Sequence, residues 1–229
     1  MANSENFKIS AALKDLIGKE LITDEFVAVF ELVKNSFDAN ATKVEVIFEN
    51  NYEEKNARIV IKDNGKGMNY DDLRNKWLFV AYSAKRTGKE NDDYRDKIKP
   101  QRVFAGAKGV GRFSCDRLGK QLNMISIKDE ANPKIENLIV HWEDFENADE
   151  KEFVNIKVTH TELQENPYNI KHGTILEITG LRDNWNRDRI LKLKKSLAKL
   201  INPNQGNDSD KFDIEIIAKD ELNLDKAPN

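Results

Sequence analysis

The sequence of 229 residues is poor in several features that define other classes of protein. Its single cysteine, Cys115, excludes an internal disulfide bond and a zinc site built from cysteines. No stretch approaches the roughly 20 consecutive apolar residues that a membrane-spanning helix needs. The first residues also lack the basic and then apolar pattern of a secretion signal. We therefore expect a cytoplasmic protein without a membrane partner.

A large excess of charge of one sign is absent as well. The chain has 37 Lys and Arg residues against 40 Asp and Glu residues, so its formal net charge is −3. A mildly negative chain does not coat nucleic acid by bulk attraction, although a local basic patch is compatible with this balance. The three histidines, His141, His160 and His172, show no metal-ligand spacing, and we expect none of them to be a catalytic ligand.

The pattern of apolar residues predicts helices and strands in a mixed order. They do not alternate strictly along the chain, which favours an α+β fold of packed layers over a doubly wound parallel sheet. The polar residues 81–110 have weak periodicity, which is typical of a long functional loop. We expect an N-terminal arm at 1–22, one domain at 23–218 and a frayed tail or linker at 219–229. The predicted helices cover residues 24–39, 70–78, 110–118 and 183–201, and the predicted strands cover 43–50, 57–62, 121–128, 136–142, 153–159, 174–180 and 211–218.

The first polar motif lies on the predicted helix at 24–39. Glu31, Asn35 and Asp38 are spaced i, i+4 and i+7, which places them within roughly 60° of one another around a helix. A solvated polar stripe is the ordinary interpretation of this spacing. Asn is a poor residue for a helix interior, however, and its amide oxygen can bind a hard cation. A Glu one turn away can polarise a water molecule, so a catalytic interpretation is also open.

The second motif, Asp63-Asn64-Gly65-Lys66-Gly67-Met68, directly follows a predicted strand. A strand-ending turn is one interpretation, because Asp, Asn and Gly are strong turn residues. The two glycines on either side of Lys66 would also allow the backbone to approach a flat ligand closely. A carboxylate at the end of the strand can accept a hydrogen bond from an exocyclic amine.

The third motif, Gly106-Ala107-Lys108-Gly109-Val110-Gly111-Arg112-Phe113, precedes a predicted helix. Glycines before a helix expose backbone N–H groups, which favours a phosphate ligand, and Lys108 and Arg112 add positive charge. A flexible hinge is the alternative. The motif is not a Walker A loop, because Arg112 and Phe113 replace the required Lys and Ser or Thr. It is not a Rossmann fingerprint either, since Ser114 stands where the third glycine is needed.

In order and spacing, these motifs resemble the sequence boxes of the GHKL superfamily, which comprises gyrase, heat-shock chaperones, histidine kinases and MutL. We name them box 1 (Glu31–Ala39), box 2 (Asp63–Met68), box 3 (Gly106–Gly111) and box 4 (Gly173–Thr174). The resemblance implies the Bergerat ATP-binding fold, a two-layer α/β sandwich with helices over one face of a mixed, mostly antiparallel sheet. It also implies ATP and Mg²⁺ as ligands.

The resemblance implies a role for each matched residue. Asn35 would contact Mg²⁺, and Asp63 would accept a hydrogen bond from the adenine N6 amine. Glu31 would be the general base that activates water in the ATPase branches, whereas the histidine-kinase branch typically lacks a Glu there. Residues 81–108 would form the lid over ATP. The other implied nucleotide-binding residues are Asp38, Gly65, Gly67, Met68, Lys85, Lys108, Gly109, Val110, Gly111, Arg112 and Thr174.

Box 1 is most similar to the chaperone, MutL and MORC side of the superfamily, which implies ATP hydrolysis. The expected function is an ATPase module of a larger machine, with lid closure and homodimer formation on ATP binding. In such machines a downstream transducer domain supplies a Lys or Arg, so the domain alone should hydrolyse ATP slowly. The alternatives are a phosphotransfer domain of the histidine-kinase type and a clamp that binds ATP without hydrolysis.

The predicted helix at 183–201 is rich in positive charge. It carries six basic residues between Arg187 and Lys199. A solvated face is the ordinary interpretation, and a local patch that binds DNA or a protein partner is the alternative.

Overall fold

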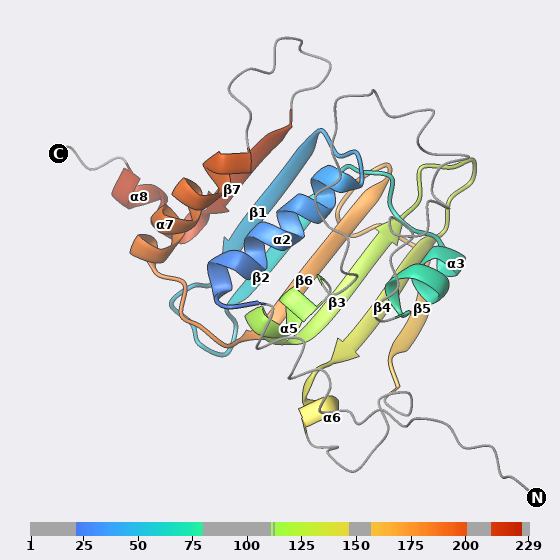
Figure 1. Cartoon of the computed structure of the whole chain (residues 1–229), viewed down its shortest axis with the longest axis horizontal. Coiled ribbons are helices and arrows are strands. Elements are labelled where there is room, and N and C mark those ends of the chain that lie inside the picture. The colour runs from blue at the N-terminus through green and yellow to red at the C-terminus, as the bar shows by residue number, and fades with distance from the viewer. Residues whose placement is uncertain (1–21, 80–110, 112, 147–156, 201–211, 226–229) are drawn as a thin grey trace, which may run out of the picture.

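The computed structural model describes residues 22–79, 111, 113–146, 157–200 and 212–225. They form a seven-stranded sheet with helices on one of its faces (Figure 1). The strand order is β5-β4-β3-β6-β2-β1-β7, in which β1 and β7 are parallel and the other neighbours antiparallel. This mixed sheet confirms the predicted α+β fold class. The strands are β1 (Lys43–Glu49), β2 (Arg58–Asp63), β3 (Gly119–Ile127), β4 (Ile135–His141), β5 (Thr159–Leu163), β6 (Gly173–Leu181) and β7 (Asp213–Ala218).

The strands alternate between the helix-covered face and the opposite face, because successive side chains of a strand point to opposite sides. In β1, Val44, Val46 and Phe48 are buried under the helices. Asp63, the last residue of β2, pairs with Val44 in the antiparallel register. The strand alternation therefore places this carboxylate on the helix-covered face of the sheet.

The main helix, α2 (Glu25–Asp38), crosses the middle of that face (Figure 1). Asp24 caps its N-terminus, where the carboxylate accepts a hydrogen bond of 2.8 Å from the Val27 amide. α7 (Arg187–Leu197) lies beside it on the same face, with Ile190 and Leu193 in the shared core. The other helical elements are α3 (Tyr70–Asp72), the π-helix η1 (Leu73–Trp77), α5 (Phe113–Leu118), α6 (Glu143–Glu146), α7 (Arg187–Leu197), the 3₁₀ turns η4 (Ala198–Leu200) and η6 (Lys219–Glu221), and α8 (Leu222–Asp225).

The core between the helices and the sheet is built around aromatic side chains. Trp185 is fully buried, and its ring lies 5.7 Å from that of Phe26 on α2 and 5.0 Å from that of Phe48 on β1. Such edge and tilted contacts add to the apolar area that the rings remove from water. A smaller apolar cluster forms on the opposite face of the sheet, where Tyr168 and Ile170 cover β2, β3 and β6. Both faces of the central strands are therefore packed.

A predicted strand and the predicted tail differ from the structure in their position or conformation. The strand expected at 153–159 lies instead at 159–163, as β5, and residues 147–156 are outside the described part. β5 is the edge strand and its sequence, THTEL, is mostly polar, so it carries little apolar signal. Residues 219–225, expected as part of a frayed tail or linker, instead form η6 and α8. Glu221 is buried there and accepts a hydrogen bond from the Tyr52 hydroxyl.

The helix predicted at 183–201 is shorter in the structure. Asn186 caps it, so α7 begins at Arg187, and η4 completes it at Leu200. Residues 1–21 of the arm predicted at 1–22 and the lid predicted at 81–108 lie outside the described residues, and Ile22 is buried in the core. Within the described part of the chain, none of the helices has the length and apolar content of a membrane span.

Candidate functional site

The centre of the candidate site is the carboxylate of Asp63, which is only 8% exposed. Its Oδ2 atom accepts a hydrogen bond of 2.9 Å from the Ser36 hydroxyl of α2. Its Oδ1 atom accepts two backbone N–H bonds, one of 2.8 Å from Gly65 and one of 3.2 Å from Thr174. This one side chain therefore joins residues of box 1, box 2 and box 4.

The environment of Asp63 acts on its charge in opposite directions. Burial raises the pKa of the carboxyl above its ordinary value, and the hydrogen bonds from Gly65, Ser36 and Thr174 lower it. Burial is the larger effect, so the net pKa is raised. The ionised carboxylate is therefore incompletely compensated, and a further N–H donor in front of it would stabilise the charged form.

A second polar contact lies next to Asp63, at Ser126 of β3. The Ser126 side chain is fully buried, and its hydroxyl accepts a hydrogen bond of 2.8 Å from the Met68 amide. The same hydroxyl lies 3.3 Å from the hydroxyl of Thr174, its partner in the β3–β6 pairing. The sequence motifs did not identify Ser126. Its only signal in the sequence is a hydroxyl at the alternate position that follows the apolar residues Leu122 and Met124.

His172 is the other residue of this site that sequence reasoning missed. Its Nδ1 atom lies 2.8 Å from the carbonyl oxygen of Gly65. A carbonyl oxygen only accepts hydrogen bonds, so Nδ1 must carry the proton in this contact. His172 therefore ties the box 2 turn to the residue before box 4.

Two glycines of the boxes are required by close backbone contacts. Gly67 has φ +58°, and a Cβ atom there would lie 1.9 Å from the carbonyl oxygen of Ile127. Gly173 has φ +130°, and a Cβ atom there would lie 2.0 Å from the carbonyl oxygen of Asp63. Any side chain at these positions would separate the box 2 turn from β3 or β6. The glycines thus hold the backbone tightly around the buried carboxylate.

Replacing Gly67 by Ala is therefore expected to lower the free energy of unfolding by about 3–5 kcal/mol. The matched control is Gly180→Ala, because Gly180 has a similar φ of +61° but its nearest neighbour is the Cβ atom of Lys120 at 3.2 Å, a far milder contact than the one at Gly67. The control carries the left-handed backbone cost alone, about 1–2 kcal/mol. Urea unfolding of the two variants measures the difference. Equal losses of stability would show that the Gly67 contact has no importance.

The three polar residues of the box 1 motif on α2 differ in how far they are exposed to solvent. Asn35 is exposed, Glu31 is half-buried and Asp38 is buried. Lys34 forms an ion pair with Glu31, with 3.6 Å between its Nζ and the Glu31 Oε1. Glu31 and Asn35 are four residues apart on α2, so their side chains lie one helical turn from each other.

Gly111, the last residue of box 3, lies against Asn35 of box 1, toward the C-terminal end of α2. A Cβ atom at Gly111 would lie 3.1 Å from the Asn35 Nδ2, so the Gly111 backbone runs against the Asn35 amide. The four boxes, far apart in sequence, therefore converge on one side of the sheet. The remaining predicted site residues, Lys85, Lys108, Gly109, Val110 and Arg112, lie outside the described residues.

The family comparison agrees with this arrangement of the four boxes. Residues 23–174 match the family model described as "Histidine kinase-, DNA gyrase B-, and HSP90-like ATPase". The chain belongs to this GHKL family. The match begins just before α2 and ends at Thr174, so it includes all four boxes. The resemblance inferred from the motifs is therefore confirmed.

Two similar proteins place this GHKL domain on the MutL side of the superfamily. The DNA mismatch repair protein MutL of Thermosipho melanesiensis is 28% identical over 162 residues, which cover 71% of this chain and 24% of the relative. MutL of Thermosipho africanus is 39% identical over 70 residues, which cover 29% of this chain and 12% of the relative. The GHKL domain thus matches about a quarter or less of the length of these MutL proteins.

The GHKL domain has limited means of its own to hold a metal ion. In the part of the chain that the structure describes, no three His, Cys, Asp or Glu side chains are grouped as metal ligands. The exposed amide of Asn35 is a hard, neutral oxygen donor beside the Gly111 backbone. This donor suits Mg²⁺ held chiefly by phosphate oxygens and water.

Proposed function

We propose that this GHKL domain binds ATP with Mg²⁺ and hydrolyses it to ADP and phosphate. The observation that carries the proposal is the buried carboxylate of Asp63, which lies where box 1, box 2 and box 4 meet and accepts hydrogen bonds from Ser36, Gly65 and Thr174. The exocyclic amine of adenine supplies a further donor. Gly67 and Met68 line the base, and Thr174 supports the contact.

The two oxygens of Asp63 are not equivalent for this purpose. Oδ1 already accepts two backbone N–H bonds, from Gly65 and Thr174, whereas among the described residues Oδ2 accepts one hydrogen bond, from the Ser36 hydroxyl. A carboxylate oxygen has two lone pairs, so Oδ2 keeps one for the ligand. We assign the adenine N6 contact to Oδ2.

The triphosphate extends from the base toward the meeting point of box 1 and box 3. The backbone amides of box 3, including Gly111, bind the phosphate oxygens. The amide oxygen of Asn35 would hold Mg²⁺, which neutralises charge on the triphosphate when bound. Glu31 takes a proton from the attacking water as the water oxygen bonds to the γ-phosphorus and the bond to the β–γ bridging oxygen breaks.

The test of this function is calorimetry of the chain with ATP and with adenosine, each with Mg²⁺ and with EDTA. We expect EDTA to weaken ATP binding by about tenfold or more and to leave adenosine unchanged, since only the phosphates need charge neutralisation. Asn35→Ala is expected to remove this dependence on Mg²⁺. Asn223→Ala, which changes an exposed Asn on α8, is the control and should behave as the wild type. A well-folded chain that gives no heat with ATP would refute the proposed function.

In a longer protein, we propose that ATP binding closes residues 81–108 over the nucleotide and drives dimerisation of this domain. The MutL relatives extend well beyond the matched region, so a following transducer domain would supply the Lys or Arg that contacts the γ-phosphate. Nucleic acid is a candidate partner of such a protein, since both relatives are named for DNA mismatch repair. Sedimentation of the longer protein with a non-hydrolysable ATP analogue tests the dimer, and a strict monomer would contradict it.

A further inference from the structure

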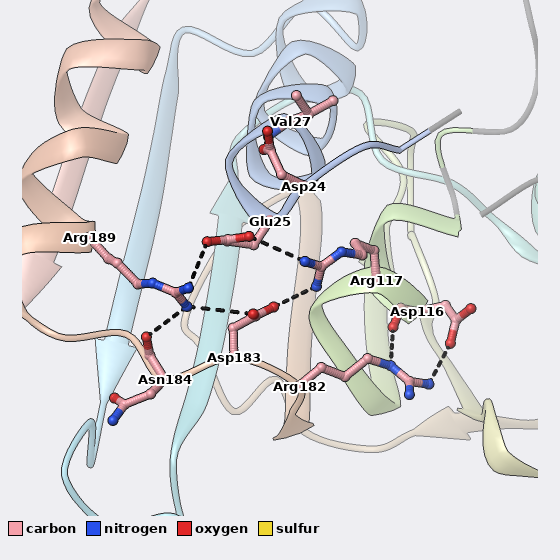
Figure 2. Close-up of polar contacts among 9 residues, drawn as sticks. All are labelled: Asp24, Glu25, Val27, Asp116, Arg117, Arg182, Asp183, Asn184 and Arg189. Atoms are coloured by element: carbon pink, nitrogen blue, oxygen red, sulfur yellow. Dashed lines mark hydrogen bonds and ion pairs between the residues drawn. The ribbon is translucent and has the colours of Figure 1, made fainter. Parts of the chain in front are cut away.

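A ring of four charged side chains joins the start of α2, the end of α5 and the start of α7 (Figure 2). Arg117 contacts the Oε2 atom of Glu25 at 3.2 Å and the Oδ2 atom of Asp183 at 2.5 Å. Arg189 contacts the other oxygen of each acid, Glu25 Oε1 at 3.3 Å and Asp183 Oδ1 at 3.5 Å. We call these four residues the ionic ring. Each acid binds both arginines, so the ring is closed.

The ionic ring is largely shielded from water. The side chain of Glu25 is 8% exposed, that of Asp183 20%, that of Arg117 26% and that of Arg189 35%, so the two acids are the best shielded. Isolated surface ion pairs contribute little to stability, but charges in a shielded network are screened less and hold their geometry better. Glu25 also lies in the first turn of α2, where a negative charge suits the helix dipole. The ionic ring therefore holds the start of α2, the end of α5 and the start of α7 together.

A second set of contacts holds the same end of α5. The Arg182 guanidinium donates to the Asp116 carbonyl at 2.7 Å and to the Asp116 carboxylate at 2.8 Å. The Arg182 amide donates to the Leu118 carbonyl at 3.0 Å. The last residues of α5 are thus attached to the segment that follows β6.

The opposite end of α5 leads to the phosphate-binding box. The Ser114 amide donates to the Gly111 carbonyl at 3.0 Å, and Gly111 lies against Asn35. α5 has six residues, so it spans about 9 Å between the ring and box 3. α2 and α5 therefore run antiparallel, joined at one end by Glu25 and Arg117 and at the other by Asn35 and Gly111.

We infer that Arg117 is a positioning residue for the triphosphate. It holds α5 against α2, so that Gly111 stays beside Asn35 where the phosphates and the metal would bind. Asp63 and Thr174, which we propose contact the base, lie on strands whose pairing does not involve Arg117. Loss of Arg117 should therefore weaken recognition of the phosphates and spare recognition of the base. This inference rests on the proposed function.

The experiment compares the affinities of adenosine and of a non-hydrolysable ATP analogue with Mg²⁺, by calorimetry, in the wild type and in Arg117→Gln. We expect the affinity for the analogue to fall about tenfold and that for adenosine to stay within about twofold. Arg117→Lys keeps the charge but cannot bind both acids in a fork, so it should give an intermediate loss. The control is Arg58→Gln, which removes a pair with Glu49 elsewhere in the sheet and should leave both affinities unchanged.

The possible outcomes separate this inference from the proposed function. A wild type that binds neither ligand refutes the proposed function and the inference with it. A wild type that binds both, with Arg117→Gln binding the analogue equally well or losing both ligands equally, overturns the inference alone. If Arg117→Gln does not fold, Asp183→Asn loosens one side of Arg117 and is expected to weaken the analogue about threefold and adenosine not at all. Wild-type affinity for the analogue in Asp183→Asn would likewise overturn the inference.

Discussion

Replacing Asp63 by Asn is expected to weaken ATP binding by about 100-fold or more. The amide oxygen of Asn would occupy the Oδ1 position, because two backbone N–H groups, from Gly65 and Thr174, point at that atom. The amide NH₂ group would then occupy the Oδ2 position. There it would face the adenine amine, and two donors cannot form a hydrogen bond with each other.

The folded state is expected to survive this substitution. The two backbone bonds to the Oδ1 position are kept, and the Ser36 hydroxyl can accept from the new amide instead of donating. Removing the charge also removes the cost of burying it, which is the larger influence on the pKa of Asp63. Asp129→Asn, an exposed change beside the box 2 turn, is the control and should bind ATP as the wild type does. An Asp63→Asn chain that binds ATP within threefold of wild type would contradict the assigned role.

The raised pKa of Asp63 gives the same substitution a second readout. The folded chain holds this proton more tightly than the unfolded chain, whose carboxyl has the ordinary pKa of 3.8. The stabilising effect of the proton is therefore present at low pH and lost as the pH rises through the raised value. Urea unfolding of Asp63→Asn against pH should lack this loss. ATP binding requires the ionised carboxylate, so wild-type affinity should change in the opposite direction and improve as the pH rises.

The site residues that the sequence predicts lie in short local motifs, each of which also has an ordinary structural interpretation. Asn35 lies in the middle of a helix, Asp63 directly follows a β-branched strand, and Gly67 stands in a short turn with a second glycine. Asn35 departs from what a helix favours, whereas Asp63 and Gly67 also fit an ordinary strand-ending turn. Their order along the chain added the information that the local patterns lacked.

The residues that were missed have roles that depend on contacts distant in sequence. Ser126 supports the box 2 turn only because β3 pairs with β6 in a register that sets it opposite Thr174. His172 reaches the carbonyl of Gly65 because β2 and β6 are neighbours in the sheet. Strand pairing between distant segments cannot be calculated from periodicity. These two contacts were therefore not predictable from one sequence.

In the basic helix α7, too, the sequence did not predict which charged side chains form ion pairs. The sequence pattern favoured a solvated face, and Lys192, Lys195 and Lys199 are exposed in the structure. The arginines of the helix behave differently, because Arg189 turns to Glu25 and Asp183 in the ionic ring. Counting positive charges could not separate the two groups. The planar guanidinium, which suits paired carboxylates, explains why arginine occupies the ring.

Replacing Glu31 by Gln is expected to reduce the rate of ATP hydrolysis by about 100- to 10,000-fold, with little change in ATP affinity. The amide of Gln keeps the size and position of the side chain but cannot take a proton from water. The half-buried Glu31 lies one helical turn from Asn35 and pairs with Lys34 at 3.6 Å, and it has no assigned contact with the base. Binding and hydrolysis should therefore separate in this variant.

Single-turnover assays with the protein in excess over labelled ATP measure the chemical step even when hydrolysis is slow. The control is Glu143→Gln, which changes a solvent-accessible carboxylate on α6 that pairs with Lys120 at 2.9 Å. A rate in Glu31→Gln within threefold of the wild type would remove Glu31 from the mechanism. A rate below detection in both the wild type and Glu31→Gln, with tight ATP binding in each, would favour a clamp that works by nucleotide binding alone. The rate of the chemical step thus distinguishes the proposed ATPase from a switch that works by nucleotide binding alone.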